Sequence, residues 1–205
     1  IQNQDTGLVR IELRSGETGS VVDLSLTSGQ IINDGFGHTE SIVGPGNVWE
    51  IRGDILADNF TGSDNDESFI TSGGNDFVDG GDGFDRVSYE RGEFSSGINA
   101  NLNLASNTVT GTFNNGGTAT AFSDDLVNVE WIRGTRFDDV LTGTSAANRL
   151  QGRGGEDSIL GGGGADTLEG GDGDDSLFVP DTGFSKVDGG AGNDLLGILG
   201  GGQVL

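Results

Sequence analysis

Acidic side chains recur every nine residues in two stretches of the sequence, each behind a cluster of glycines. Residues 161–178 hold two consecutive units, GGGGADTLE and GGDGDDSLF, with glycine at positions one, two and four, aspartate at six and a large apolar residue at eight. Ca²⁺ prefers six to eight oxygen ligands from carboxylates and backbone carbonyls. The chain has one His and no Cys, the usual transition-metal ligands. We therefore predict calcium sites.

The nine-residue units form two phased arrays. The first array starts its units at residues 53, 62, 71 and 80; the second starts at 134, 143, 152, 161 and 170, with one more unit at 189. Position six is occupied by Asp58, Glu67, Asp76 and Asp85, then by Asp139, Asn148, Asp157, Asp166, Asp175 and Asp194. Units 53–61, 62–70 and 143–151 lack most of the glycines, so we expect weaker calcium sites there. Terminal repeats are often atypical in this way.

The candidate ligands are of two kinds. One kind is the position-six side chains, and the other is the glycines and neighbouring residues of the turns, whose backbone carbonyls would face the ion. The turn set is Gly73, Gly74, Gly80, Gly81, Asp82, Gly83, Gly152, Gly154, Gly155, Gly161, Gly163, Gly164, Gly170, Asp172, Gly173, Gly189, Ala191 and Gly192. For any single aspartate, a turn-forming role that bonds its own backbone is an equally good explanation. The phasing of the whole set favours calcium.

Each unit supplies a tight turn of about six residues and a strand of about three, because glycines permit the positive φ of a sharp turn. Side chains alternate along a strand, so position eight points inward while positions seven and nine point outward. Two units then complete one coil of a flattened solenoid, and turns eighteen residues apart share an edge. The expected pairs are Asp58–Asp76, Glu67 (or Asp66)–Asp85, Asp139–Asp157, Asn148–Asp166 and Asp157–Asp175, with Asp175–Asp194 as well if the irregular turn at 179–188 keeps the phase of the repeats.

The rest of the chain predicts strands as well. Residues 8–13 and 21–26 alternate apolar and polar side chains, and turn-forming residues follow at 33–35 and 44–46. Residues 47–53 match 128–134 at an offset of 81, so the chain is a duplicated module. We predict an all-β fold, a parallel β-roll or β-solenoid. Its expected parts are a β spacer or cap (1–52), a first array (53–88), a β spacer (89–133) and a second array (134–205).

The charge and hydropathy of the chain exclude several classes of binding partner. The formal charge of −23 disfavours nucleic acids and anionic membranes. No apolar run approaches the ~20 residues that a membrane-spanning helix needs. The chain begins at Ile1 without Met or a visible signal peptide, so we expect a piece of a longer protein. High charge with few apolar residues is also typical of disorder; disorder without metal and order with metal would reconcile both patterns.

At these repeats the sequence resembles the RTX (repeats-in-toxin) haemolysin-type calcium-binding family. The resemblance covers about half of the chain and implies a parallel β-roll, several bound Ca²⁺ ions and calcium-dependent folding. It also implies export by a type I secretion system of a Gram-negative bacterium, and hence an extracellular location. The C-terminus does not obviously resemble the family's secretion signal.

The expected function is a calcium-binding structural module of a secreted protein. One alternative is a non-catalytic adhesion or glycan-binding region, in which Trp49, Trp131, Tyr89 and Phe113 stack on sugars; here we expect one tryptophan to face inward and the other outward. Another is the C-terminal part of a secreted hydrolase with its catalytic domain elsewhere. His38 stands alone, and neither His-Glu-x-x-His nor Gly-x-Ser-x-Gly occurs, so we predict no enzyme in this chain.

Overall fold

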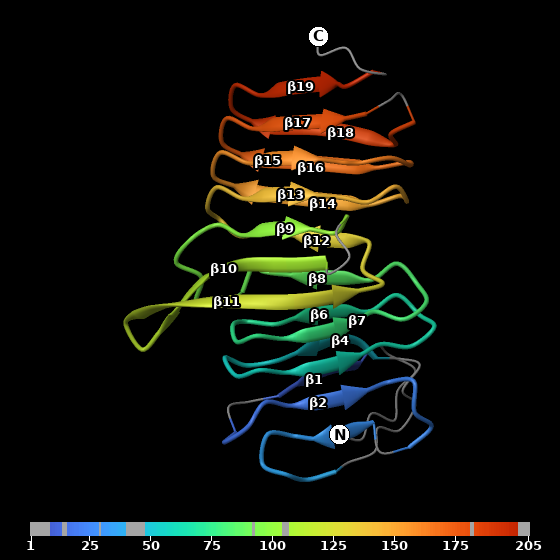
Figure 1. Ribbon diagram of the computed structural model, residues 1–205, viewed down its shortest axis with the longest axis vertical. Helices are drawn as coiled ribbons and strands as arrows, with labels where there is room; N and C mark the ends of the chain where they lie inside the picture. Colours follow the sequence, from blue (N-terminus) through green and yellow to red (C-terminus); the bar gives the residue numbers. More distant parts are fainter. Residues whose placement is uncertain are drawn as a thin grey trace.

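The protein is a stack of short strands in two sheets (Figure 1). The computed structural model describes residues 9–13, 16–28, 30–39, 48–91, 93–103, 107–180 and 183–200. In order across the sheet, the eight-stranded sheet contains β1 (Val9–Glu12), β4 (Val48–Arg52), β6 (Ser68–Ile70), β8 (Arg86–Ser88), β12 (Trp131–Arg133), β14 (Arg149–Gly154), β16 (Thr167–Asp172) and β18 (Lys186–Ala191). The eleven-stranded sheet contains β19 (Leu195–Ile198), β17 (Ser176–Val179), β15 (Ser158–Leu160), β13 (Val140–Thr142), β9 (Asn99–Asn101), β10 (Asn107–Asn115), β11 (Thr118–Val127), β7 (Phe77–Asp79), β5 (Asn59–Thr61), β2 (Val21–Asp23) and β3 (Ile31–Asn33).

Consecutive nine-residue units contribute strands to the two sheets alternately. Leu150 therefore pairs with Leu168 in the eight-stranded sheet, and Ile159 pairs with Leu177 in the eleven-stranded sheet, always in parallel. One coil is thus eighteen residues long, as the sequence predicts. The irregular segment 179–188 preserves the stacking, because Val187 pairs with Leu168. Among the described residues there is no helix, and the all-β parallel roll is confirmed.

The core is a double column of position-eight side chains between the sheets. All nine in the units from 53 to 178 are completely buried: Phe60, Phe69, Val78, Val87, Leu141, Leu150, Ile159, Leu168 and Leu177. Burying one such side chain contributes roughly 1.5–3 kcal/mol. For these nine units the prediction that position eight points inward is confirmed, whereas Leu196, at position eight of the last unit, is 50% exposed. These columns fix the height of each coil and thereby the spacing of the turns at both edges.

The spacer strands continue the same sheets. β1, β4 and β12 extend the eight-stranded sheet, and β2 and β9 extend the other one in parallel with repeat strands. A long antiparallel hairpin, β10–β11, is inserted in the eleven-stranded sheet and extends sideways from the stack (Figure 1). The repeat pattern does not predict this hairpin. The four-part division of the chain remains a prediction.

The first spacer contains two predicted turns and the loop residue His38, and the structure describes all of these except the second turn. The turn at 33–35 is present: Gly35 has φ of 89° and its N–H donates to Asn33 Oδ1 over 3.0 Å. The turn expected at 44–46 lies outside the described residues. His38 is an exposed loop residue, and its Nδ1 lies 3.0 Å from Asp34 Oδ2.

Candidate calcium sites

The position-six side chains stack in two columns, one along each edge of the roll. The main-chain N–H of Asp139 donates to Asp157 Oδ1, and that of Asp157 donates to Asp175 Oδ1, both over 2.8 Å. The same contact joins all six pairs expected from the sequence, at 2.7–3.0 Å: Asp58–Asp76, Glu67–Asp85, Asp139–Asp157, Asn148–Asp166, Asp157–Asp175 and Asp175–Asp194. Each contact leaves one carboxylate oxygen for another partner.

In four turns the position-six side chain accepts a hydrogen bond from position two of its own unit, and we call them closed turns: 53–58, 62–67, 134–139 and 143–148. In 134–139, the N–H of Thr135 donates to Asp139 Oδ2 over 2.7 Å and the Thr135 hydroxyl donates to Oδ1 over 3.0 Å. Asp54, Ser63 and Thr144 donate in the same way from position two. None of these position-two residues has a positive φ. The position-six side chains of closed turns are therefore satisfied without a metal.

The six other turns, 71–76, 80–85, 152–157, 161–166, 170–175 and 189–194, have the opposite geometry, and we call them open turns. Position two has a positive φ in all of them: Ser72 71°, Gly81 94°, Arg153 86°, Gly162 91°, Gly171 126° and Gly190 99°. The backbone at position two no longer directs its N–H at the carboxylate. As a result, Oδ2 of Asp76, Asp85, Asp157 and Asp175 is buried without a hydrogen-bond donor. Such an oxygen is costly unless a cation or proton joins it.

Glycines in open turns face carbonyl oxygens of the neighbouring coil. A Cβ built on Gly173 would lie 1.9 Å from the carbonyl oxygen of Gly155, and one on Gly81 would lie 2.3 Å from that of Ser63. A Cβ on Gly152 would lie 1.9 Å from Asp157 Oδ2. The absence of a side chain therefore lets carbonyl and carboxylate oxygens approach these glycines closely, and such oxygens are the donor set that Ca²⁺ prefers.

Burial raises the pKa of the stacked carboxyl groups. Loss of solvation is the largest cause in every case: it raises the pKa of Asp58 and Asp139 to about 6 and that of Asp85 and Asp157 to about 7. The pKa of Asp76 is raised further by the neighbouring charge of Asp124. Without a cation these sites therefore favour protons, since burial opposes the negative charge.

Two carboxylates in the spacer continue the columns, and the sequence analysis missed both. Asp124 Oδ1 accepts the N–H of Asp76 over 3.0 Å, and Glu130 Oε2 accepts that of Asp85 over 3.1 Å. The available signal is the acid at two residues before a buried apolar residue, Leu126 or Ile132, as in a repeat unit. Because no glycine cluster precedes either acid, the nine-residue pattern does not include them.

The residues present fit calcium only if the backbone takes part. Among the described residues, no three His, Asp or Glu side chains gather as a metal site. Four open turns instead combine an unsatisfied carboxylate oxygen with close backbone oxygens of the neighbouring coil, and their carboxylates belong to Asp76, Asp85, Asp157 and Asp175. Hard oxygen ligands of this kind suit Ca²⁺.

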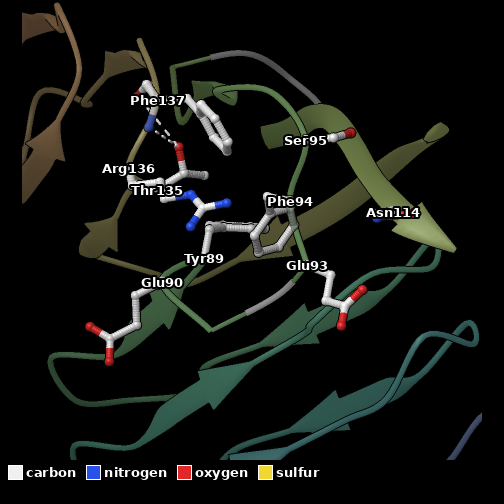
Figure 2. A pocket seen from close by; sticks show the side chains of 9 residues that line it. All are labelled: Tyr89, Glu90, Glu93, Phe94, Ser95, Asn114, Thr135, Arg136 and Phe137. Carbon is white, nitrogen blue, oxygen red and sulfur yellow. Dashed lines mark hydrogen bonds between the residues drawn. The ribbon is translucent and has the colours of Figure 1, made fainter. Parts of the chain in front are cut away.

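Of the four aromatic residues considered for sugar binding, two lie in the core, as a packing role would require, and the two tryptophans lie on one groove. Phe113 and Tyr89 are 3% and 1% exposed, so neither ring is free to stack on a ligand. The Tyr89 hydroxyl donates to Asp124 Oδ2 over 2.9 Å, and its ring lies in the wall of a cavity of about 580 Å³ (Figure 2). Trp49 and Trp131 do not face opposite sides: both are partly exposed and line one groove.

Comparison with protein families agrees with this geometry. The model for the RTX calcium-binding nonapeptide repeat matches four copies, over residues 53–93, 142–177 and 181–196. No curated protein matches the chain. The matched segments contain all six open turns. Across residues 53–196, this chain therefore belongs to the RTX calcium-binding nonapeptide repeat family, whose repeats bind several Ca²⁺ ions and form a parallel β-roll.

Proposed function

We propose that this chain is a calcium-dependent folding module of a secreted protein. It is unfolded at the low calcium concentration of the bacterial cytosol, leaves through a type I secretion system and folds outside the cell. The observation that supports this most strongly is the set of buried carboxylate oxygens without donors in Asp76, Asp85, Asp157 and Asp175. In an ion-free roll at neutral pH these groups oppose folding.

The proposed ligands follow from the two turn geometries. In each open turn, Oδ2 of the position-six aspartate binds the ion together with backbone carbonyls of that turn and of the turn one coil away. The proposed carboxylate ligands are Asp76, Asp85, Asp157, Asp166, Asp175 and Asp194. Closed turns supply carbonyl oxygens and rigid support, because their side chains are already paired. Extracellular calcium sites bind at about 10⁻⁴–10⁻³ M, which suits such partly backbone-built sites.

Ligand binding and folding are then the same equilibrium. The site requires two coils to be stacked, so it exists only in the folded chain, and binding free energy is folding free energy. Folding outside the cell would also hinder backward movement through the exporter. The RTX repeats are a structural, non-catalytic module. Any hydrolase activity would belong to other parts of a longer protein.

Circular dichroism with a calcium titration tests the proposal. We expect a coil-like spectrum in excess chelator and a β spectrum at millimolar Ca²⁺, whereas the same concentration of Mg²⁺ leaves the coil. Mg²⁺ is the matched control because it requires near-ideal octahedral geometry and releases water reluctantly. A chain with an unchanged β spectrum in chelator would contradict calcium-dependent folding.

A further inference from the structure

The positive charge of this acidic chain is concentrated on one face of the roll. The sequence has 10 Lys and Arg residues against 33 Asp and Glu residues. The described strands of the eleven-stranded sheet contain no Lys or Arg, whereas the eight-stranded sheet carries Lys186 and six arginines. These are Arg10, Arg52, Arg86, Arg133, Arg149 and Arg153, with side chains 13–44% exposed. We call this outer surface the basic face.

Tryptophans hold several of these guanidinium groups in place. Trp131 lies between Arg86 and Arg149 from the two adjacent strands, with the guanidinium carbons 4.9 and 4.3 Å from its ring centre. Its indole N–H donates to Gln151 Oε1 over 3.0 Å, which fixes the ring. Such cation–π contacts orient the arginines at little further cost in side-chain entropy.

The basic face already binds one carboxylate with an excess of arginine. Glu50 Oε1 lies 2.6 Å from Nε of both Arg10 and Arg52, and its Oε2 lies 3.7 Å from Arg86 Nη2. Three positive charges therefore surround one negative charge. The local excess is two, in a chain whose formal charge is −23.

A second cluster on the basic face, centred on Glu90, also has several arginines around one carboxylate. Glu90 pairs with Arg133 at 2.6 Å, with Arg91 at 3.3 Å and with Arg153 at 3.8 Å. Here too three arginines share one carboxylate. Planar guanidinium groups recognise carboxylates through paired N–H donors, so both clusters are suited to further carboxylates from a ligand.

An aromatic groove lies on the same side of the molecule. It has a volume of about 310 Å³ and is bounded by Trp49, Trp131 and Phe84, with Asp66 and Glu67 at its side. Phe84 is 38% exposed. Aromatic rings cover the apolar face of a sugar, and the exposed Asp66 carboxylate can accept hydrogen bonds from its hydroxyl groups, whereas Glu67 is buried and paired with Ser63. The groove thus fits one sugar ring, while the arginine clusters fit acidic substituents on neighbouring sugars.

We propose that the basic face binds a carboxylated polysaccharide. One sugar lies in the groove between Trp49 and Trp131, and carboxylates of flanking sugars lie at the arginine clusters around Glu50 and Glu90. A carboxylated sugar chain carries one charge per acidic sugar, whereas duplex DNA carries one per roughly 1.7 Å and is repelled more strongly by the acidic remainder of the molecule. The proposal requires the folded roll, and hence rests on the proposed function for its calcium-loaded state.

Isothermal titration calorimetry on the calcium-loaded chain tests this. The probe is a six-sugar oligogalacturonate, and the control ligand is its methyl ester of the same length, with equal free calcium in both solutions. We expect the acid form to bind at least tenfold more tightly than the ester. The double variant Arg86→Gln/Arg133→Gln should bind the acid form at least tenfold more weakly, and Trp49→Ala should also weaken it.

Asn59→Asp is the matched control, because Asn59 is an exposed residue of β5 in the eleven-stranded sheet and its substitution lowers the formal charge by one, as an Arg→Gln change does. It should change the affinity less than twofold. A calcium-induced β spectrum for each variant separates loss of binding from loss of folding. Absence of binding, equal binding of the ester, equal weakening by Asn59→Asp, or equally tight binding of single-stranded DNA would each overturn the proposal.

Discussion

At the scale of single residues, the backbone at position two decides what the position-six carboxylate can bind. Thr135 and Thr144 donate to Asp139 and Asn148, so position two supplies a donor to an acid in one closed turn and to an amide in another. In open turns the left-handed backbone removes that donor. Left-handed backbone at the non-glycine residues Ser72 and Arg153 is strain of the kind that gathers at functional sites.

The difference between open and closed turns predicts a large effect for an Asp→Asn substitution in an open turn and a small effect for the same substitution in a closed turn. Asp157→Asn removes a proposed calcium ligand and should raise the calcium concentration needed for folding on the order of tenfold, about 1.4 kcal/mol, because ligand charge sets affinity. Asp139→Asn removes no proposed ligand and should raise that concentration less than Asp157→Asn does, only through loss of one hydrogen bond, since an amide cannot accept both the Ile98 and the Thr135 N–H. Calcium titrations followed by circular dichroism measure both. Equal effects at the two sites would refute the distinction between turn types.

At the scale of elements, the short distance between stacked coils leaves no room for a side chain at certain turn positions. Gly173 has φ of 132° and faces the Gly155 carbonyl oxygen, whereas a Cβ on Gly163 would lie 3.5 Å from its nearest neighbour, an ordinary contact. Both glycines belong to open turns. The sequence alone presents them as similar members of a glycine cluster, and only the packing of coils distinguishes them.

We therefore expect Gly173→Ala to destabilise the calcium-loaded roll by about 2–3 kcal/mol, through overpacking and backbone strain together. Gly163→Ala should change the unfolding free energy by less than about 0.5 kcal/mol. Urea unfolding at saturating calcium provides the comparison. If both substitutions cost the same, the coil spacing described here is incorrect at this turn.

At the scale of the whole molecule, charge burial links folding to pH as well as to calcium. The pKa of Asp85 and Asp157 rises to about 7, and that of Asp58 and Asp139 to about 6, above the ordinary value of 3.8. A raised pKa in the folded state means that the fold binds protons more tightly than the unfolded chain does. Its contribution to stability is complete below about pH 4 and is lost as pH rises through 6–7.

Metal-free protein should accordingly gain β structure as pH falls from 8 to 4, because protons neutralise the stacked carboxyl groups. Protons and calcium compete for the same oxygens of the folded chain, so the stability that calcium adds should shrink as pH falls below about 7. Circular dichroism of dialysed protein across this pH range, with and without calcium, measures both trends. Metal-free protein whose β content grew with increasing pH would contradict the burial of these carboxyl groups.

Much of the fold could be predicted from local periodicity. An apolar residue at every position eight specified the buried columns, and the eighteen-residue coil specified which acids are neighbours. The antiparallel β10–β11 hairpin could not be predicted this way, because its nine- and ten-residue strands carry no repeat. Asp124 and Glu130 were missed for a related reason: they enter the columns through strand register and not through a turn motif.

The sequence by itself determined the repeat length, the family, the inward residues and the preference for an oxygen-binding cation, because each depends on spacing along one strand and one turn. Tertiary structure alone decided which carboxylate oxygens remain without donors and where the arginines gather. Those properties depend on backbone angles and on strands from distant parts of the chain meeting across a sheet. Thr135 and Arg153 both occupy position two, yet only stacking shows that one closes its turn and the other leaves it open.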